Sequence, residues 1–160
     1  MALTVLAGGH AGAFAISAPA FAEGQPMPAH FAYRGDNVSP ELRISGAPAG
    51  TVCFALIVED PDAPSGLWTH WLVANIPPGT TRIAEGQLPA GAVVGRNSFH
   101  NARYDGPVPP SGTHRYVFHL YALDRPVHVP ASFSRTALEA QFDHHVLGTC
   151  ETFGTYAASP

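Results

Sequence analysis

Lysine is absent from this sequence, and charged residues of every kind are scarce. The 160 residues include eight arginines, charged side chains make up 12% of the chain, and the formal net charge is −4. So little positive charge argues against nucleic acids and anionic membrane surfaces as partners. The low charged fraction also argues against intrinsic disorder and coiled coils, which both need many charged residues.

Cysteine is scarce as well, and no apolar run is long enough to form a transmembrane segment. Cys53 and Cys150 are too few for a disulfide framework, so we expect two buried free thiols in a reducing, cytoplasmic compartment. Residues 1–22 are mostly apolar or small and end in Ala20-Phe21-Ala22, which is similar to a signal-peptide cleavage site. Because no lysine or arginine precedes this stretch, export is the alternative location rather than the favoured one.

Glycine and proline are abundant by contrast, with 16 of each. Because they accompany many Val, Phe and Tyr residues without a periodic repeat, they indicate turns between strands. The length predicts a single domain over residues 1–160, with 1–12 as a loosely structured lead-in. Hydrophobic alternation predicts strands over 13–17, 41–45, 51–60, 68–76 and 114–123, and the first face of 68–76 holds Trp68, His70, Leu72 and Ala74.

One helix is predicted, over residues 136–146. Thr136 and Glu139 have the spacing of a capping box, Leu138 and Phe142 lie on one helical stripe, and Gly148 follows as a terminator. Many strands with a single late helix favour an antiparallel sandwich that carries a peripheral helix.

Three titratable residues, Asp60, His70 and His114, lie at predicted strand ends beside Pro/Gly-rich loops. A carboxylate can orient imidazole rings that donate to an anion, while Trp68 and Tyr116 supply apolar walls. This pattern indicates a site for a phosphate or carboxylate group. Each residue also has a structural explanation, since Asp60 suits a turn and a histidine on an apolar strand is commonly a core residue.

Two longer motifs make these residues familiar. Asp60-Pro-Asp-Ala-Pro64 with Trp68-Thr-His70, and the segment from Gly106 to Tyr116 (GPVPPSGTHRY), resemble the phosphatidylethanolamine-binding protein family, also called the Raf kinase inhibitor protein family. The resemblance is to its bacterial branch and extends over about 14–156.

The resemblance implies a mainly β fold, an antiparallel Greek-key sandwich with one or two peripheral helices and an anion pocket at one end. It also implies a cis peptide bond at Pro64 and a phosphate-facing backbone amide near Val108. The residues expected to bind the ligand are Asp60, Pro64, Trp68, His70, Gly106, Val108, Pro109, His114 and Tyr116.

The expected function is therefore binding of a small phosphorylated or carboxylated ligand, such as a phosphatidylethanolamine-like headgroup, with no cofactor and no catalysis. One alternative is inhibition of a kinase or protease, as is known for the family. The less favoured alternative is a metal-dependent enzyme that uses Asp60, His70 and His114 as ligands. A hydrolase would need a nucleophile, and the sequence has no G-x-S-x-G motif. A homodimer is compatible with the family but is not indicated by the residues.

Overall fold

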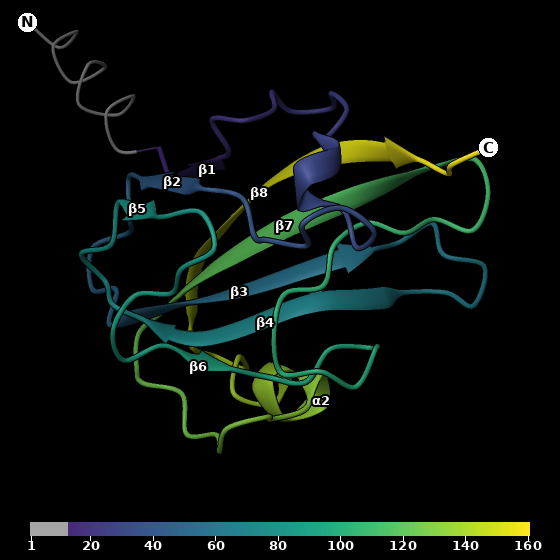
Figure 1. Cartoon of the computed structure of the whole chain (residues 1–160). Coiled ribbons are helices and arrows are strands. Elements are labelled where there is room, and N and C mark those ends of the chain that lie inside the picture. Colours follow the sequence, from purple (N-terminus) through teal and green to yellow (C-terminus); the bar gives the residue numbers. More distant parts are fainter. Residues whose placement is uncertain (1–12) are drawn as a thin grey trace, which may run out of the picture.

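The computed structural model describes residues 13–160, which form two antiparallel β-sheets with two short helices at their periphery (Figure 1). The strands are β1 (Ala15–Ser17), β2 (Leu42–Ser45), β3 (Cys53–Asp60), β4 (Trp68–Ile76), β5 (Arg82–Ile83), β6 (Val93–Val94), β7 (Thr113–Leu123) and β8 (Val146–Ala157). The helices are a 3₁₀ turn, η1 (Ala29–Phe31), and α2 (Arg135–Glu139). This arrangement confirms the mainly β, antiparallel fold with peripheral helices that the sequence predicts.

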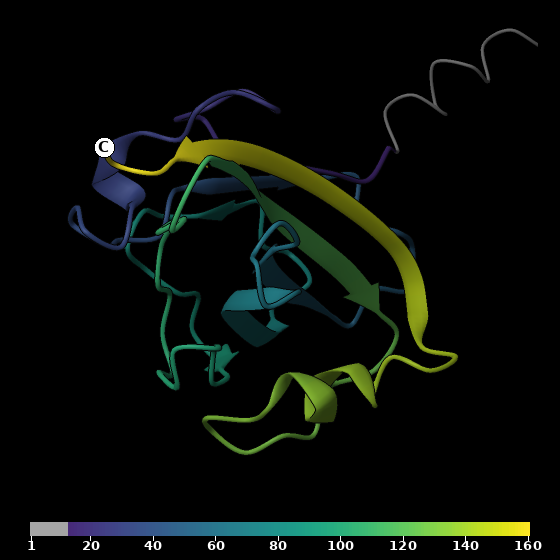
Figure 2. The same ribbon diagram turned by 90° about the vertical axis from the view of Figure 1, so that its right-hand side faces the viewer.

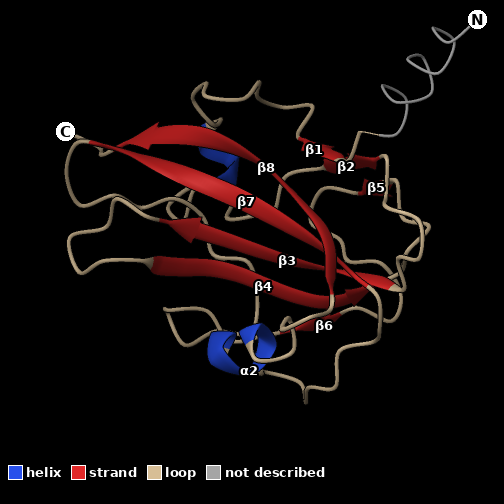
Figure 3. Cartoon of the chain, turned by 180° about the vertical axis from the view of Figure 1, so that it is seen from behind, coloured by secondary structure: helices blue, strands red, loops and turns tan. Residues whose placement is uncertain are grey.

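The larger sheet has five strands in the order β6-β4-β3-β7-β8, and the smaller has three in the order β1-β2-β5. After β4 the chain leaves the larger sheet and returns through a long connection, so that β7 pairs with β3. Seen from the side, the smaller sheet covers one face of the larger sheet, and α2 lies against the other (Figure 2). The view from behind shows β3, β4 and β7 as neighbours whose ends meet at one edge of the molecule (Figure 3).

Apolar side chains fill both spaces beside the larger sheet. The inner core, between the two sheets, includes Phe54, Leu56, Trp71 and Phe118 with Leu42 of β2. The outer core, on the face toward α2, is formed by buried residues that include Ala55, Ile57, Leu72, Phe133 and Leu138. Every residue of β3 is buried, which explains why its sequence is apolar at consecutive positions instead of alternating.

A β-bulge interrupts the pairing of β3 with β4. Val58 opposes Trp71 and Glu59 opposes Thr69, so His70 is the extra residue on β4. As a result His70 lies on the inner-core side together with Trp71, where its ring contacts Tyr116, while Leu72 faces the outer core. The prediction that His70 and Leu72 share one face is therefore wrong, because simple alternation cannot include the extra residue.

The predicted helix over 136–146 is also wrong in its extent. The helix ends at Glu139, and its N-cap is Ser134, whose hydroxyl accepts a hydrogen bond from the Ala137 amide. Arg135 ties this short helix to the larger sheet through the Glu59 carboxylate, at 2.5 Å. Val146 instead begins β8, a strand that sequence patterning missed because glycine and threonine interrupt its apolar positions.

The N-terminal segment contributes to the fold as far as it is described. β1 pairs with β2, and Ile16, Ala18 and Phe21 are buried in the inner core. Cleavage after Ala22 would remove these side chains from the core, which weighs against the signal-peptide alternative. The loosely structured lead-in expected at 1–12 lies outside the described residues. Over 13–160, no helix is long and apolar enough to cross a membrane.

Both cysteines are free thiols, as expected, but only one is fully buried. Cys53 lies in the outer core, and its thiol donates to the Arg125 carbonyl oxygen at 3.3 Å. Cys150 on β8 is partly exposed, and burial of its sulfur raises the pKa of its thiol to about 12. A thiol with so high a pKa is a poor nucleophile near neutral pH.

Gly154 offers a test of how closely the smaller elements pack on β8. A Cβ at this position would lie 2.4 Å from Met27 Cγ and 2.9 Å from the Phe21 ring. We expect Gly154→Ala to lower the free energy of unfolding by about 2 kcal/mol, because the core must shift to make room. Gly79→Ala is the matched control, since a Cβ there meets no atom within 4 Å. Urea denaturation of both variants measures the difference, and equal stabilities would contradict this packing.

Candidate functional site

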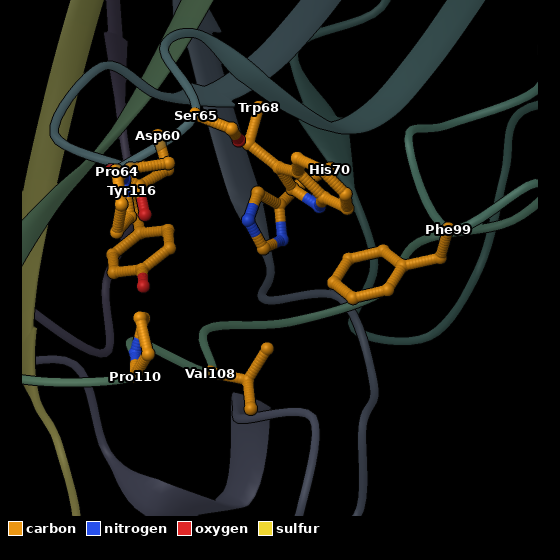
Figure 4. Close-up of a pocket in the computed structure, with 10 residues that line it drawn as sticks. Asp60, Pro64, Ser65, Trp68, His70, Phe99, Val108, Pro110 and Tyr116 are labelled. Carbon is orange, nitrogen blue, oxygen red and sulfur yellow. The ribbon is translucent and has the colours of Figure 1, made fainter.

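A cavity of about 280 Å³ opens where the β3–β4 turn meets the loop that precedes β7. Because β3 is flanked by β4 and β7 in the sheet, the ends of three strands converge on this space. Most of the side chains around it are apolar or aromatic, and Figure 4 shows the His70 ring among them. The lining residues are Asp60, Ala63, Pro64, Ser65, Trp68, His70, Phe99, Val108, Pro110 and Tyr116.

Asp60, the last residue of β3, is held in place from two directions. Its Oδ2 is 2.6 Å from His114 Nδ1 on β7, and its Oδ1 accepts from the Asp62 amide at 2.8 Å. Asp62 in turn binds the Arg115 guanidinium, which lowers the pKa of the Asp62 carboxyl to about 2. The β3–β4 turn is thus fastened to the start of β7 beside the Asp60–His114 pair.

His70 has a different partner from the one expected. Its Nδ1 lies 2.6 Å from the backbone carbonyl oxygen of Asp105, and a carbonyl oxygen can only accept. The ring proton is therefore on Nδ1, which leaves Nε2 unprotonated whenever the ring is neutral. Burial lowers the pKa of His70, since the ring is 2% exposed. The expectation that Asp60 fixes both histidine tautomers holds for His114 but is wrong for His70.

Tyr116 carries an unpaired hydroxyl into the cavity. The residue is 1% exposed, and among the described residues its Oη is the one buried side-chain polar atom without a hydrogen-bond partner. Figure 4 shows this hydroxyl pointing toward the side of the cavity formed by Val108 and Pro110. Burial and the nearby Asp60 carboxylate raise the pKa of Tyr116 well above its ordinary value, so the group stays a proton donor.

The carbonyl that holds His70 belongs to a residue whose side chain is the hub of a buried polar network. The fully buried Asp105 carboxylate accepts four hydrogen bonds, each 2.9 Å long, from Asn37, Asn97, Asn101 and Arg103. Burial alone would raise the pKa of Asp105, but these hydrogen bonds outweigh it and the pKa is lowered. Sequence reasoning missed this network because its members are scattered through loops with no periodic spacing.

Three of the nine expected ligand residues do not line the cavity, namely Gly106, Pro109 and His114. The Gly106 amide is already used, since it donates to Asn37 Oδ1 at 2.7 Å. Glycine is required there for packing, because a Cβ would lie 1.9 Å from the Phe31 carbonyl oxygen. His114 is buried behind Asp60 as its hydrogen-bond partner. The expected cis bond at Pro64 is wrong, since residues 13–160 contain no cis peptide bond.

The structure adds four lining residues that the sequence did not indicate: Ala63, Ser65, Phe99 and Pro110. Phe99 has the largest side chain of these, and its ring packs edge-on against Trp68 and His70. It comes from an irregular loop far from both motifs. The network around Asn97 and Asp105 shapes this loop, and that network leaves no local sequence signal.

The metal-site alternative finds no support in the described part of the chain. No group of three or more His, Cys, Asp or Glu side chains within residues 13–160 is arranged to hold a metal ion. Asp60 and His114 bond to each other, and His70 bonds to a backbone carbonyl.

Comparison with known proteins identifies relatives over nearly the whole chain. The family model described as phosphatidylethanolamine-binding protein matches residues 17–157. A UPF0098 protein of Methanothermobacter thermautotrophicus is 42% identical over 86% of this chain and 94% of its own length. A Mycobacterium tuberculosis protein named "Putative lipoprotein LppC" is 40% identical over 88% of this chain and 71% of its own length.

Two crystal structures share the fold. The phosphatidylethanolamine-binding protein homolog CT736 of Chlamydia trachomatis superposes with a TM-score of 0.87 at 36% identity, covering 92% of this chain and 99% of that one. Escherichia coli YBCL, described as a member of the mammalian family, has a TM-score of 0.85 at 32% identity, with 91% and 99% covered.

The Asp105 network can be tested with an isosteric substitution. We expect Asp105→Asn to lower the free energy of unfolding at pH 7 by about 3 kcal/mol, because an amide nitrogen would face hydrogen-bond donors in a buried space. The depressed pKa of Asp105 means that its contribution is present above the pKa of the unfolded carboxyl and is lost as the pH falls through the folded value. The stability difference should therefore shrink as the pH falls below about 4.

Urea denaturation at several pH values measures this difference. Asp62→Asn serves as the comparison, because Asp62 is a more exposed carboxylate that is also paired with an arginine. A loss at pH 7 no larger than that of Asp62→Asn would show that the network contributes little.

Proposed function

The chain belongs to the phosphatidylethanolamine-binding protein family, and we propose that its cavity binds small phosphorylated or carboxylated molecules. The observation that carries this proposal is the Tyr116 hydroxyl, a buried donor that makes no hydrogen bond of good geometry to the described residues, although the Asp60 carboxylate and the Val108 backbone lie near it. Leaving such a group unpaired costs stability, typically about 1–3 kcal/mol. An anionic oxygen from a ligand in the cavity would provide the missing acceptor.

Charge balance in the cavity determines how an anion would be held. Asp60 contributes a carboxylate to the wall, and no lysine or arginine lines the space. A neutral His70 presents only a lone pair at Nε2, which repels an anionic oxygen. Binding of a fully ionised anion therefore requires a proton on His70, so that Nε2 donates beside the Tyr116 hydroxyl.

The walls indicate what is attached to the anionic group. Trp68, Phe99 and Pro64 form an apolar surface around a space large enough for a few non-hydrogen atoms besides a phosphate. Asp60 supplies an acceptor at the same site, which suits an ammonium or hydroxyl group on the ligand. A phosphoethanolamine-like headgroup has this combination of charges, and we propose this class as the ligand.

We propose binding rather than catalysis as the role of the site. Ser111 is the serine closest in sequence to His114, but it does not line the cavity. Ser65 lines it, but within the described residues its hydroxyl has no hydrogen bond to a histidine that could activate it, and Asp60 is already engaged by His114. The alternative considered from the sequence was inhibition of a kinase or protease. No specific feature of residues 13–160 favours it over ligand binding. Cytoplasmic location and a homodimer stay predictions, and a relative named as a lipoprotein keeps export as an alternative.

Tyr116→Phe separates a binding role from a structural one. The substitution removes one oxygen that has no protein partner, so we expect unchanged or slightly higher stability to urea. We expect the affinity for phosphorylethanolamine, measured by calorimetry, to fall about tenfold because a hydrogen bond to a charged group is lost. Unchanged affinity, or a clear loss of stability, would show that the hydroxyl has a structural role instead. Tyr33→Phe, outside the cavity lining, is the control.

Sulfate provides a probe of the histidine, because it remains a dianion from pH 5 upward. The pKa of His70 is lowered in the free protein and would be raised by a bound anion. Binding should therefore take up a proton, and the affinity should fall as the pH rises through the range between the two values. Calorimetry in bis-Tris and in imidazole, which have different ionisation enthalpies, measures the proton uptake directly. His70→Gln should abolish that uptake, whereas proton-independent binding would contradict the mechanism.

A further inference from the structure

A second hollow, which we call the Arg103 groove, lies apart from the cavity and shares no lining residue with it. Its volume is about 370 Å³ and it is open to solvent on one side. It is formed by the segments 37–39, 86–88 and 102–104, with Trp71 of β4 and Val94 of β6. The relatives and the sequence motifs described above assign no role to these residues.

Among residues 13–160, Arg103 is the only charged residue that lines this groove. Its Nε donates to Asp105 Oδ1 at 2.9 Å, and the Asp105 carboxylate is fully buried. The buried Asp105 carboxylate therefore holds the Nε side of the guanidinium in place, while 58% of the Arg103 side chain stays exposed to solvent. Its two terminal amino groups make no hydrogen bond to the described residues. Because one edge of the guanidinium is already anchored, the Arg103 side chain loses less conformational entropy when a ligand binds than a free arginine side chain would.

Two further donors belong to the same groove. Trp71 and Ser39 are 2% and 5% exposed, and neither the indole N–H nor the Ser39 hydroxyl makes a hydrogen bond within the described part of the chain; unlike Tyr116 Oη, neither atom is completely shielded from solvent. Other polar groups of the lining are already used: Tyr104 donates to the Phe31 carbonyl, and Asn37 bonds at both ends of its amide. The groove thus offers unused donors, while no carboxylate lines it.

The remaining walls are apolar. Val38, Leu88 and Val94 line the groove with the Trp71 ring, and Leu88 is 38% exposed in spite of its apolar side chain. Anionic acceptors complement the donors, and a carboxylate can bind the guanidinium through two parallel hydrogen bonds. The apolar walls favour a carboxylate that carries an apolar body over a small inorganic anion, which has nothing to pack against them.

From this arrangement we propose that the Arg103 groove is a second binding site, specific for small organic acids that carry a carboxylate on an aromatic or aliphatic body. The carboxylate binds the outer edge of the Arg103 guanidinium, and the body packs on Val38, Leu88 and Val94 above the nearly buried Trp71 ring. The site is independent of the proposed anion cavity, because the two spaces are lined by different residues.

The two tryptophans of the chain allow a direct test. Trp68 lines the cavity and Trp71 lines the groove, so a ¹H–¹⁵N spectrum has one indole N–H signal for each space. Trp68→Phe assigns the two signals. Titration with benzoate, which is fully ionised at pH 7, should shift the Trp71 indole signal to saturation, and a response of Trp68 would report separate binding in the cavity. Benzamide has the same shape without the charge, and should shift the Trp71 signal at least tenfold more weakly.

Two variants complete the test. Arg103→Gln should weaken benzoate binding about tenfold, while Arg125→Gln makes the same charge change at an exposed arginine that does not line the groove and should have no effect. Benzoate and benzamide that shift Trp71 equally in the wild-type protein would overturn the proposal without any variant. A benzoate shift confined to Trp68, or no saturable shift at all, would overturn it as well.

Discussion

The burial of the Asp105 carboxylate is the constraint on which the functional part of this molecule depends. A fully buried charge is tolerated only when its acceptor capacity is filled, and here four side chains from two separate loops fill it. Satisfying that charge brings the 97–106 segment against β4, and the backbone carbonyl of the same residue then fixes the ring of His70. One ionised group thus determines both where a loop lies and which nitrogen of a neighbouring histidine carries its proton.

Stability and binding make opposite demands at the ends of the three central strands. Asp60, His114 and Asp62 with Arg115 form closed pairs that fasten the turn to the sheet. Tyr116 follows Arg115 on β7 and His70 lies on the neighbouring strand β4, yet each leaves an atom facing an open space. The pairs behind the cavity supply the rigidity that lets the groups in front stay unsatisfied, which is the arrangement expected of a preorganised binding site.

The sequence predicted well those features that depend on neighbouring residues and poorly those that depend on distant ones. Alternation and turn residues were enough for β3, β4 and β7, because the hydrophobic effect acts strongly on long buried strands. β8 was missed because Gly148 and Gly154 break its pattern, although Gly154 is required for close packing against Met27 and Gly148 lies tightly against Pro48. At the site, short motifs indicated six of the lining residues, whereas Phe99 depends on a loop shaped by long-range hydrogen bonds. Gly106 was assigned to the ligand because a family motif does not distinguish a residue that contacts the anion from one that lets two backbones meet.

The bulge at His70 has a consequence for how this fold can vary. Between the Val58–Trp71 and Asp60–Trp68 pairs β4 carries one residue more than β3, and that extra residue puts His70 on the same side of the sheet as Trp71. Deleting Thr69 would restore regular pairing and turn the imidazole to the outer face of the sheet, and deleting His70 would remove the imidazole itself. Substitutions can alter the chemistry of this cavity without changing its frame. Insertion or deletion of one residue in β4 would instead change which side chains face the cavity. In this chain, a change in the length of the loops around the site would therefore disturb the cavity less than a change in the length of the strand beneath it.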